Sequence, residues 1–518
     1  MTTPRTFLRR GTALLAAAGL LAGAAGATWW ATLTPTAAQA EVGAISVPAA
    51  VTESVYACPA SPGNSVGAVD LGQTSSATSI TVLGAGTRAA YGGQRLEGST
   101  LSTDDAVGGV LTLAPGQDSE ASATGLVTTS TASGDLRGLT ASACAPASAV
   151  SWIVGGSAAL GSSSELRLVN PGRTTVTATV TLYGSTGPLT LPSGGQVAVP
   201  AGGSASVLLE SASSADARVA VSVEADGGML IPSLATESLD GETPAGTDVL
   251  TAGAAPSTDL LVPGVVLADP EKDAGSSDAG SSGGEAHSGA QDGGGVQAAA
   301  GPALRIVNPS EAEATVSVTL VGADGEKELP GAQSLVIDPG AVFDVSLEGV
   351  AAGTYGIRVT SDQPVAGAAR LVRTAGEYPA GSGTLMRDVA WVQAQDAAVV
   401  ADAALTVPAP GRGQTITSTL VLTNPARQSA TVTLAAATGS WSQEVTVPGG
   451  KTVSVDLDAD TLPQGTGALT LSAPQGSQVR AAAVLTQSVE GDAAGTLIAV
   501  VPPVADAAAA SARSLQLR

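Results

Sequence analysis

Few residues in this chain carry side chains suited to covalent or metal chemistry. Its 518 residues include one histidine, His287, and two cysteines, Cys58 and Cys144. His287 lies in a stretch made almost entirely of Gly, Ser, Ala, Asp and Glu, where nothing would hold it against a nucleophile and an acid. A Ser-His-Asp or Cys-His mechanism requires that fixed geometry, so we expect neither. One histidine also cannot supply a histidine-rich transition-metal site.

Carboxylates are the other groups that could do chemistry. A glycosidase-type pair needs no histidine, but here Asp and Glu are scattered singly in expected turns, without an aromatic cluster to hold a sugar ring. Asp456, Asp458 and Asp460 alternate at the end of an expected strand and could offer oxygens to Ca²⁺. A calcium loop would also place a glycine and a distal glutamate, so a solvated acidic strand end is favoured. We therefore expect no enzyme, no cofactor and no metal site.

The two cysteines are expected to form a disulfide. Cys58 and Cys144 lie near opposite ends of the stretch 46–148, in a chain that begins with an export element. Exported proteins reach oxidising surroundings in which paired thiols persist as disulfides. Closing a loop of this length is worth about 3–5 kcal/mol in the chain-entropy model. A reactive or metal-binding pair is the alternative.

Three tryptophans could offer stacking surfaces to a polysaccharide. Trp152, Trp391 and Trp441 are each isolated within strand-like sequence. Tryptophans in that context more often belong to a core or pack between domains. A glycan-binding role would require at least one of the three to be exposed on a flat face.

A pattern that occurs three times predicts the elements that position these residues. Each copy contains Asn-Pro, with apolar residues two and four positions before the Asn and small or apolar residues six, eight, ten and twelve positions after it. Thr or Ser fills most positions between them. Such alternation is typical of half-buried strands, and Asn-Pro favours a turn. We interpret the turn residues as structural: Asn170, Pro171, Asn308, Pro309, Asn424 and Pro425.

The repeat predicts an all-β protein made of tandem immunoglobulin-like β-sandwich domains after one N-terminal hydrophobic helix. Each unit contains about seven short predicted strands separated by Gly/Pro turns, as expected for that fold. The first unit is a worn copy in which Ser76–Leu83 resembles the Thr-rich strand that follows Asn-Pro elsewhere. The predicted domains are 46–148 (divergent, with the disulfide), 149–248, 256–400 and 403–504.

Two segments are expected to be disordered. The insertion 269–301 within the third unit is too poor in apolar residues to offset the entropy of ordering it. The tail 505–518 is rich in alanine and follows the last predicted strand. Both therefore lie outside the predicted cores.

Residues 1–40 form an export element. Basic residues precede an apolar run from Gly11 to Leu33, which is long enough to cross about 30 Å of hydrocarbon as a helix. The segment Ala38-Gln39-Ala40 matches an A-x-A cleavage site. A cleaved signal peptide and an uncleaved membrane anchor are both open, and either places the rest of the chain outside the cytoplasm.

Charge and composition exclude one class of partner. The formal charge of −23 and the sequence pI of about 4.2 disfavour nucleic acid, whose phosphates require Lys and Arg. Only 2% of the residues are aromatic, which suits thin β-sandwiches better than a deep aromatic pocket.

Cys58, Cys144, the run Trp152-Ile-Val-Gly-Gly and the motif Leu166-x-Leu-x-Asn-Pro together resemble an actinobacterial family of secreted or membrane-anchored proteins of unknown function. The resemblance covers nearly the whole chain after residue 40. It implies a Gram-positive envelope setting without a known active site.

We therefore expect a non-catalytic extracytoplasmic cell-envelope protein that acts as a spacer, scaffold or protein-interaction array. It would be secreted or anchored to the plasma membrane by its N-terminal helix, with a protein or glycan of the envelope as partner. The alternative is a carbohydrate-binding protein for cell-wall or capsular polysaccharide.

Overall fold

The computed structural model describes residues 53–84, 87–114, 122–268, 301–395, 402–411, 415–474, 476–491 and 493–505. The export element, residues 269–300 with His287, and residues 506–518 lie outside this part of the chain, so what was predicted for them stays a prediction. Residues 50–511 form one compact unit. Among the described residues, no helix is long and apolar enough to cross a membrane.

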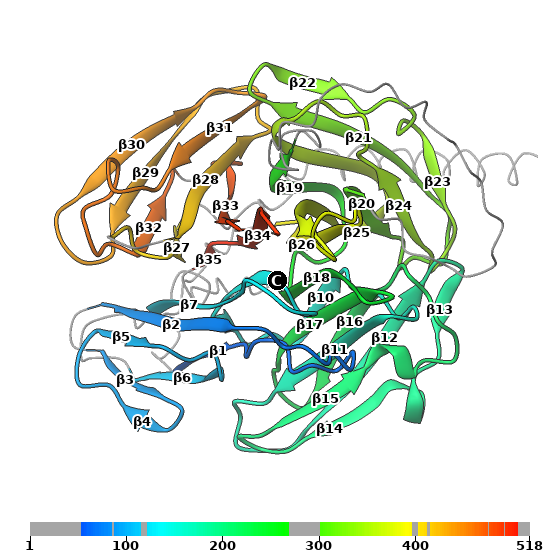
Figure 1. The fold of residues 1–518 in the computed structure, drawn as a ribbon, viewed down its shortest axis with the longest axis horizontal. Helices are drawn as coiled ribbons and strands as arrows, with labels where there is room; N and C mark the ends of the chain where they lie inside the picture. Colours follow the sequence, from blue (N-terminus) through cyan, green and yellow to red (C-terminus); the bar gives the residue numbers. More distant parts are fainter. Residues whose placement is uncertain are drawn as a thin grey trace, which may run out of the picture. The chain divides into compact units, whose positions relative to one another are not determined.

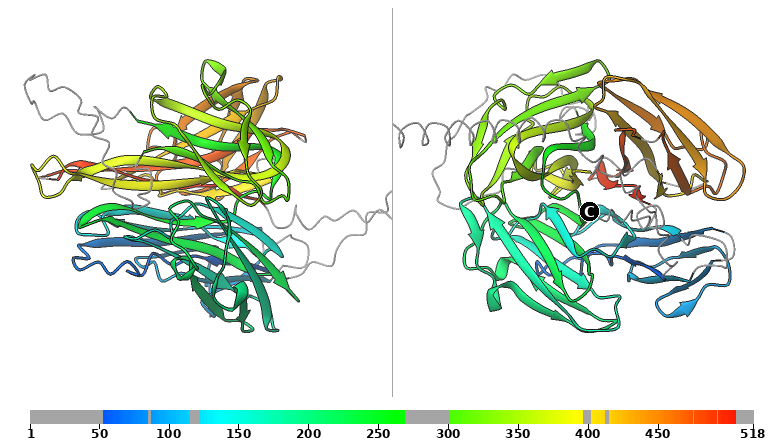
Figure 2. Two further views of the ribbon diagram at one scale, coloured as in Figure 1. Left: turned by 90° about the vertical axis from the view of Figure 1, so that its right-hand side faces the viewer. Right: turned by 180° about the vertical axis from the view of Figure 1, so that it is seen from behind.

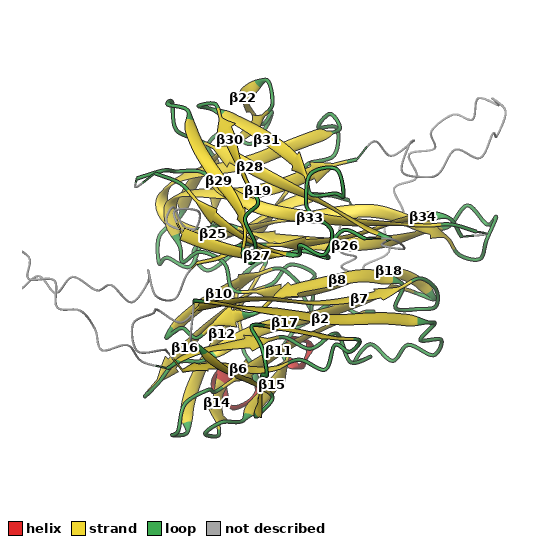
Figure 3. Ribbon diagram, turned by 90° about the vertical axis from the view of Figure 1, so that its left-hand side faces the viewer, coloured by secondary structure: helices red, strands yellow, loops and turns green. Residues whose placement is uncertain are grey.

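The predicted all-β fold is confirmed. The described residues consist almost entirely of strands and loops, with two short 3₁₀ helices (Figure 3). The strands form several antiparallel sheets, which divide along the chain into four groups of strands. We call these groups units one to four (Figure 1).

Unit one has two sheets, ordered β4-β3-β6-β1-β9 and β5-β2-β7-β8. Tyr56, Ile80, Leu111 and Val127 belong to the core that both sheets share. Its strands are β1 (Ser54–Cys58), β2 (Thr74–Leu83), β3 (Arg88–Tyr91), β4 (Gln94–Arg95), β5 (Thr100–Thr103), β6 (Gly109–Ala114), β7 (Ser122–Thr131), β8 (Gly138–Ala143) and β9 (Ala145–Pro146).

Unit two has the sheets β10-β16-β12-β13, with β14 also on β12, and β15-β11-β17-β18. Leu166, Val180 and Leu234 lie in its core. Its elements are β10 (Val150–Val154), β11 (Ser162–Val169), β12 (Val176–Gly184), β13 (Gly187–Leu189), η1 (Pro192–Gly195), β14 (Gln196–Val199), β15 (Ser204–Leu208), η2 (Leu209–Ser211), β16 (Ala220–Asp226), β17 (Ile231–Asp240) and β18 (Thr243–Thr251).

Unit three has a single eight-stranded sheet because one long strand takes part in both layers. The first part of β25 pairs with β19 and β21, and its later part pairs with β20 and β26. The strands are β19 (Ser257–Leu267), β20 (Ala303–Val307), β21 (Ala314–Gly322), β22 (Gly325–Glu328), β23 (Leu335–Ile337), β24 (Val342–Ser346), β25 (Gly353–Glu377) and β26 (Leu385–Gln393).

Unit four returns to two sheets, ordered β30-β29-β32-β27-β35 and β31-β28-β33-β34. Leu420, Leu434 and Leu485 belong to its core. Its strands are β27 (Asp402–Thr406), β28 (Ile416–Asn424), β29 (Ala430–Ala436), β30 (Ser442–Val447), β31 (Lys451–Asp456), β32 (Ala468–Ser472), β33 (Arg480–Val489), β34 (Gly495–Val501) and β35 (Val504–Ala505).

The four units share one order of strands. This order shows that the strand Ser76–Leu83 of unit one was assigned to the wrong position in the sequence analysis. Ser76–Leu83 lies in β2, which pairs with β5 and β7 as β11 pairs with β15 and β17. It therefore takes the place of the strand before Asn-Pro, not of the Thr-rich strand after it. The two strands have similar sequences because each turns one face to the core, which gives both the same alternation.

The Asn-Pro turns join the two layers of a unit. Asn170 is buried, and its Nδ2 donates to the carbonyl oxygens of Thr174 at 2.8 Å and Val199 at 3.0 Å. Its Oδ1 accepts the N–H of Gly172 at 2.9 Å. Asn308 and Asn424 make the same set of bonds in their units, so one amide fixes each crossing to the strand of the opposite sheet.

The units do not have separate cores, because neighbouring units pack on each other. Strand β8 packs against β18, β18 against β26, β26 against β34, and β34 against β8, so the contacts close from unit four back to unit one. Leu126, Leu139 and Ala141 of unit one pack into the core of unit four. Figures 1 and 2 show β18, β26 and β34 where the four groups meet.

Candidate functional site

Unit one contains a hollow of about 470 Å³ at one end of the space between its two sheets. Its lining includes Ser and Thr side chains of β2, β7 and β8, the loops 60–64 and 106–107, and Thr247 of β18 in unit two. No charged side chain is among its described lining residues. Pockets of this size in proteins commonly hold ligands.

Beyond the apolar core of unit one, the residues that face the space between the sheets are Ser and Thr. Along β2 the core residue Ile80 is followed, toward the strand start, by Ser76 and Thr74 on the same face, since side chains alternate. Ser76 Oγ bonds to Thr129 Oγ1 of β7 at 3.2 Å, and Thr74 Oγ1 bonds to Thr131 Oγ1 at 3.3 Å. Each hydroxyl has one proton and two acceptor positions, and part of this capacity is used within the pairs and by Ser61 Oγ, which also bonds to Thr129 Oγ1.

Two loops that close the hollow are held by carboxylates. The buried carboxylate of Glu237 in β17 accepts the backbone N–H groups of Asn64, Ser65 and Val66 at 2.6–3.1 Å. This fixes the loop of unit one on unit two. Asp135 Oδ2 in turn accepts the N–H groups of residues 69 and 70. The hollow is therefore pre-formed by cross-unit bonds.

The rim of the hollow carries exposed apolar side chains. Leu71 and Val107 line it, and Val107 is 78% exposed. Val69, two residues before Leu71, is also exposed. Exposed apolar residues gathered at one hollow are a common mark of an interaction surface, whereas single ones are ordinary.

The start of β2 has an unpaired edge beside the hollow. Strand β5 pairs only with Thr78–Thr81, and Val82 N–H donates to Ser99 on that side. Alternate residues direct their N–H and C=O to one side, so Thr74 and Ser76 face the same edge as Val82. Within the described residues, the backbone of neither has a hydrogen-bond partner on that edge.

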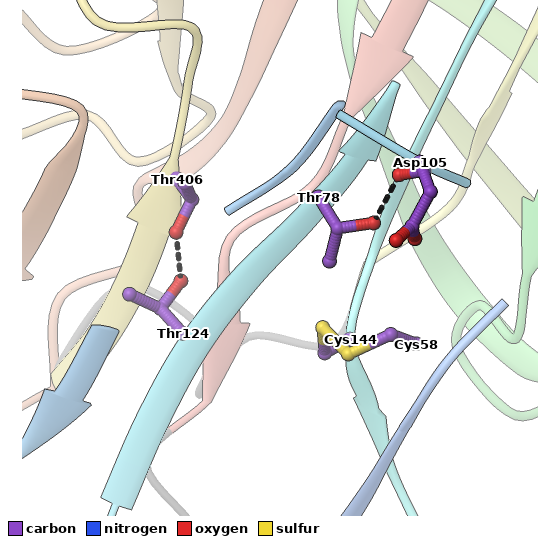
Figure 4. The surroundings of a disulfide bond; sticks show 6 residues. All are labelled: Cys58, Thr78, Asp105, Thr124, Cys144 and Thr406. Carbon is purple, nitrogen blue, oxygen red and sulfur yellow. Dashed lines mark hydrogen bonds between the residues drawn. A yellow bond between two sulfur atoms is a disulfide. The ribbon is translucent and has the colours of Figure 1, made fainter. Parts of the chain in front are cut away.

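The disulfide between Cys58 and Cys144 is present, and Cys58 ends β1 two residues before Ala60 of the hollow. It joins β1 to the residue between β8 and β9 (Figure 4). Gly125 makes room for it, because a Cβ there would lie 2.4 Å from Cys144 Sγ. Near it, Thr124 Oγ1 and Thr406 Oγ1 bond at 2.9 Å, which ties unit one to unit four.

Two buried aspartates join the units at their centre. Asp388 Oδ2 accepts the N–H of Leu139 in unit one at 3.0 Å and of Ile498 in unit four at 2.8 Å. Asp248 Oδ2 of unit two accepts the N–H of Trp391 in unit three at 2.7 Å. Burial raises the pKa of Asp248 to about 7 and of Asp388 to about 8. Both satisfy N–H groups of strands at the edges of their sheets.

A buried arginine joins units two and three. Arg305 Nη1 donates to Gly156 O at 2.6 Å, and its guanidinium pairs with Asp344 and lies 4.7 Å from the Trp391 ring centre. Burial acts to raise the pKa of Asp344, but Arg305 holds that pKa below its ordinary value. Burial and, after it, repulsion by Arg305 lower the pKa of Arg370, which also lies against the Trp391 ring, to about 10.

The predicted stacking residues do not line the hollow. Trp152 and Trp391 are 9% and 8% exposed and pack in one core between units two and three, so neither offers a flat open face. Trp441 is partly buried against the core of unit four. The hollow and the three tryptophans are thus separate features.

The alternating aspartates form a turn. Asp458 Oδ1 accepts the N–H groups of Asp460 and Thr461 at 3.0 Å, and these bonds hold the pKa of Asp458 below its usual value. Asp456 accepts a hydrogen bond from Thr419 Oγ1. In the described part of the chain, no three His, Cys, Asp or Glu side chains are grouped to hold a metal ion.

The lining residues were missed in the sequence because Thr and Ser alternate with apolar residues on every exposed strand face. One signal was available. In the run Val127-Thr-Thr-Ser-Thr131 the core-facing position of Thr131 carries a hydroxyl, where the matching run of β33, Leu485-Thr-Gln-Ser-Val489, has Val489. The core-facing position of Thr129 is polar in both strands, with Gln487 in β33. A loss of apolar residues from a core position marks the hollow.

The chain is thus an all-β protein of four packed units with a pre-formed, hydroxyl-lined hollow in the first. It belongs to a protein family of unknown function, DUF5719, whose model matches residues 99–458. This confirms the resemblance to a family of unknown function. No curated protein and no solved structure matches the chain at a significant level.

Proposed function

We propose that this protein is a non-catalytic, extracytoplasmic cell-envelope protein that binds another protein at the hollow of unit one. Each of its units is an immunoglobulin-like sandwich in this proposal, and the packed units act as a scaffold. The observation that carries it is the combination of an exposed apolar rim with a pre-formed, uncharged hollow.

The disulfide supports an extracytoplasmic location for the protein. Paired thiols persist as disulfides in secreted and surface proteins and are rare in the cytosol. Cys58 and Cys144 are both buried and bonded to each other. In the proposal residues 11–33 either anchor the protein in the plasma membrane of an actinobacterium or are removed at Ala38–Ala40, so the units face outward.

A protein partner fits the hollow better than a glycan does. Hydroxyl groups would suit either ligand, but sugar sites commonly add an aromatic platform, and no aromatic side chain is among the described lining residues. The exposed Leu71 and Val107 favour burial against apolar side chains of a protein. The test must therefore distinguish a bound glycan from a bound protein.

Photo-crosslinking in native cells tests the site. A benzophenone amino acid at position 107 is expected to trap a protein, whereas one at position 160 is not, because Leu160 is exposed in unit two and is not among the lining residues. A product sensitive to protease identifies a protein, and one sensitive only to glycosidase contradicts the proposal. Equal products at both positions, or none, also contradict it.

Determining the N-terminus of the mature protein tests the proposed extracytoplasmic location. Mass spectrometry of membranes and culture supernatant should find either a chain that begins at Glu41 or one that keeps Arg9–Trp30. The first result means a released protein and the second a tethered one. Intact protein in the cytosol with free thiols at Cys58 and Cys144 would reject an extracytoplasmic role.

A further inference from the structure

We propose that the partner enters as an extended peptide strand, which pairs with the free edge of β2 at Thr74–Ala77 and lies over the hollow. This rests on the proposed function and specifies the chemistry of its partner. The peptide carries uncharged side chains over the hollow and basic residues beside it. It would extend the sheet β5-β2-β7-β8 at the position where β5 ends.

The backbone of β2 supplies the pairing groups. Strand β2 is ten residues long, and β7 pairs with all of it, but β5 covers only Thr78–Thr81. Thr74 and Ser76 therefore present N–H and C=O groups at a spacing of two residues, which an extended peptide matches and a compact ligand does not. Thr74 is exposed and Ser76 half-buried, so the edge is reachable.

The same edge is closed in unit two. Ser162 corresponds to Ser76, since each forms a hydroxyl pair with the residue opposite it, Ser238 or Thr129. The N–H of Ser162 donates to Ala159 O at 3.1 Å. In the part of unit one that the structure describes, no turn bonds to the N–H of Ser76, and protein edges left open are the usual place of strand addition.

Charge selects the kind of peptide. Asp70, Asp104 and Asp105 are exposed and lie next to the lining residues Leu71 and Ala106 in the chain. Arg167, which donates to Ala60 O and Ser61 O of the lining, is paired with Glu165, so the three aspartates leave a net negative charge beside the hollow that attracts Lys or Arg and repels Asp and Glu. Because the lining itself is uncharged, side chains that enter the hollow are uncharged too.

The test uses the full chain and a capped peptide, Lys-Val-Thr-Val-Thr-Val-Lys, at low ionic strength. Binding is measured by calorimetry, and amide exchange is resolved to single residues. We expect binding that weakens with salt, and slower exchange at the amides of Thr74 and Ser76 in the complex. A peptide with Glu at both ends should bind more weakly.

Two variants at one residue separate backbone pairing from side-chain contact. Ser76→Pro removes the edge N–H but no bond to β7, so it should fold, as proline is tolerated at edges. It should weaken binding about fivefold or more, the effect of one lost hydrogen bond plus the ring in its place. Ser76→Ala keeps the N–H but removes the hydroxyl from the hollow, so it should lose clearly less affinity than Ser76→Pro.

The outcomes distinguish this inference from the proposed function. If the folded Ser76→Pro protein binds the peptide like the parent, or if the peptide binds without protection at Thr74 and Ser76, strand addition is wrong. Failure of the parent to bind the peptide also overturns it. A protein crosslinked at position 107 with no effect of Ser76→Pro would leave the proposed function standing and remove strand addition alone.

Discussion

Units one and four place different side chains at matching points of the same fold. The match follows from the pattern Ser/Thr-x-apolar-x-apolar in β2 and in β28, at 78–82 and 418–422. By that register Ser76 corresponds to Ile416, and Thr140 of β8 corresponds to Leu497 of β34. Ile416 and Leu497 pack with the core of unit four, whereas the two hydroxyl residues line a hollow in unit one.

In unit three, the position that corresponds to the hollow is filled by an arginine side chain. Arg373 corresponds to Thr129 by its register with β20, is buried, and donates to Val266 O at 3.0 Å. The same region of the fold is therefore filled by apolar side chains in unit four and by an arginine in unit three, and it is open in unit one. What differs is a few core-facing residues, which are packed in units three and four and line an open space in unit one.

Unit one has less apolar packing than unit four, but it contains the disulfide. Its buried cluster is smaller than that of unit four, and the cysteines belong to it. A disulfide that closes a long loop stabilises mainly by restricting the unfolded chain.

Removing the disulfide should affect unit one most. The double change Cys58→Ala and Cys144→Ala is expected to lower the free energy of unfolding by about 4 kcal/mol, from the chain-entropy estimate for its length. Urea denaturation measures the total, and amide exchange should show faster opening in β1–β9 than in β29–β32. The parent under reducing conditions is the control. Equal loss of protection in both units would refute a role confined to unit one.

Opening a hollow in unit four is the converse experiment. Leu497→Thr puts the side chain of Thr140 at the matching point and should lower the free energy of unfolding by about 3 kcal/mol, as large-to-small core changes do. Leu160→Thr, at an exposed site, is the control and should change little. A loss below about 1 kcal/mol would mean that Leu497 is not required in that core.

Asp388 joins the two units and should make stability depend on pH. Its folded pKa of about 8 exceeds the ordinary value, so the folded state keeps a proton that the unfolded chain loses above about pH 4. The stabilisation is full below that pH and is lost as pH rises through 8. Between pH 6 and 8 the parent should lose about 2 kcal/mol from this group.

The isosteric change Asp388→Asn checks the pH effect. It has no titrating group, so its stability should fall less than that of the parent between pH 6 and 8. Asp324→Asn, at an exposed turn, should keep the slope of the parent. Parallel pH profiles for the parent and Asp388→Asn would show that this carboxyl titrates as in the unfolded chain.

Filling the hollow should have the smallest effect on stability. Thr140→Leu copies unit four into unit one and should raise the free energy of unfolding by about 1 kcal/mol through added apolar burial. It should also reduce crosslinking at position 107. Thr140→Val, which is close to threonine in size, is the control. A gain in stability with unchanged crosslinking would place the partner outside the hollow.

Local patterns predicted the strands but not always their layer. The alternating residues after each Asn-Pro do form β12, β21 and β29, and the asparagines lie at the turns. The assignment of Ser76–Leu83 was wrong because both layers of a unit have the same alternation, and no Asn-Pro marked the crossing. Pairing partners, which distinguish the layers, lie far along the chain.

The all-β class, the repeat, its turns and the pairing of the cysteines could be predicted from the sequence, because each depends on neighbours within a few residues or on a count. The closed circuit of unit contacts, the aspartates that cap strands of other units, and the hollow could be found only in the folded chain. These depend on residues far apart in the chain: Asp388 meets Leu139, and Glu237 meets Asn64. A threonine at a solvated strand face and one that lines a hollow are identical in sequence, and only packing separates them.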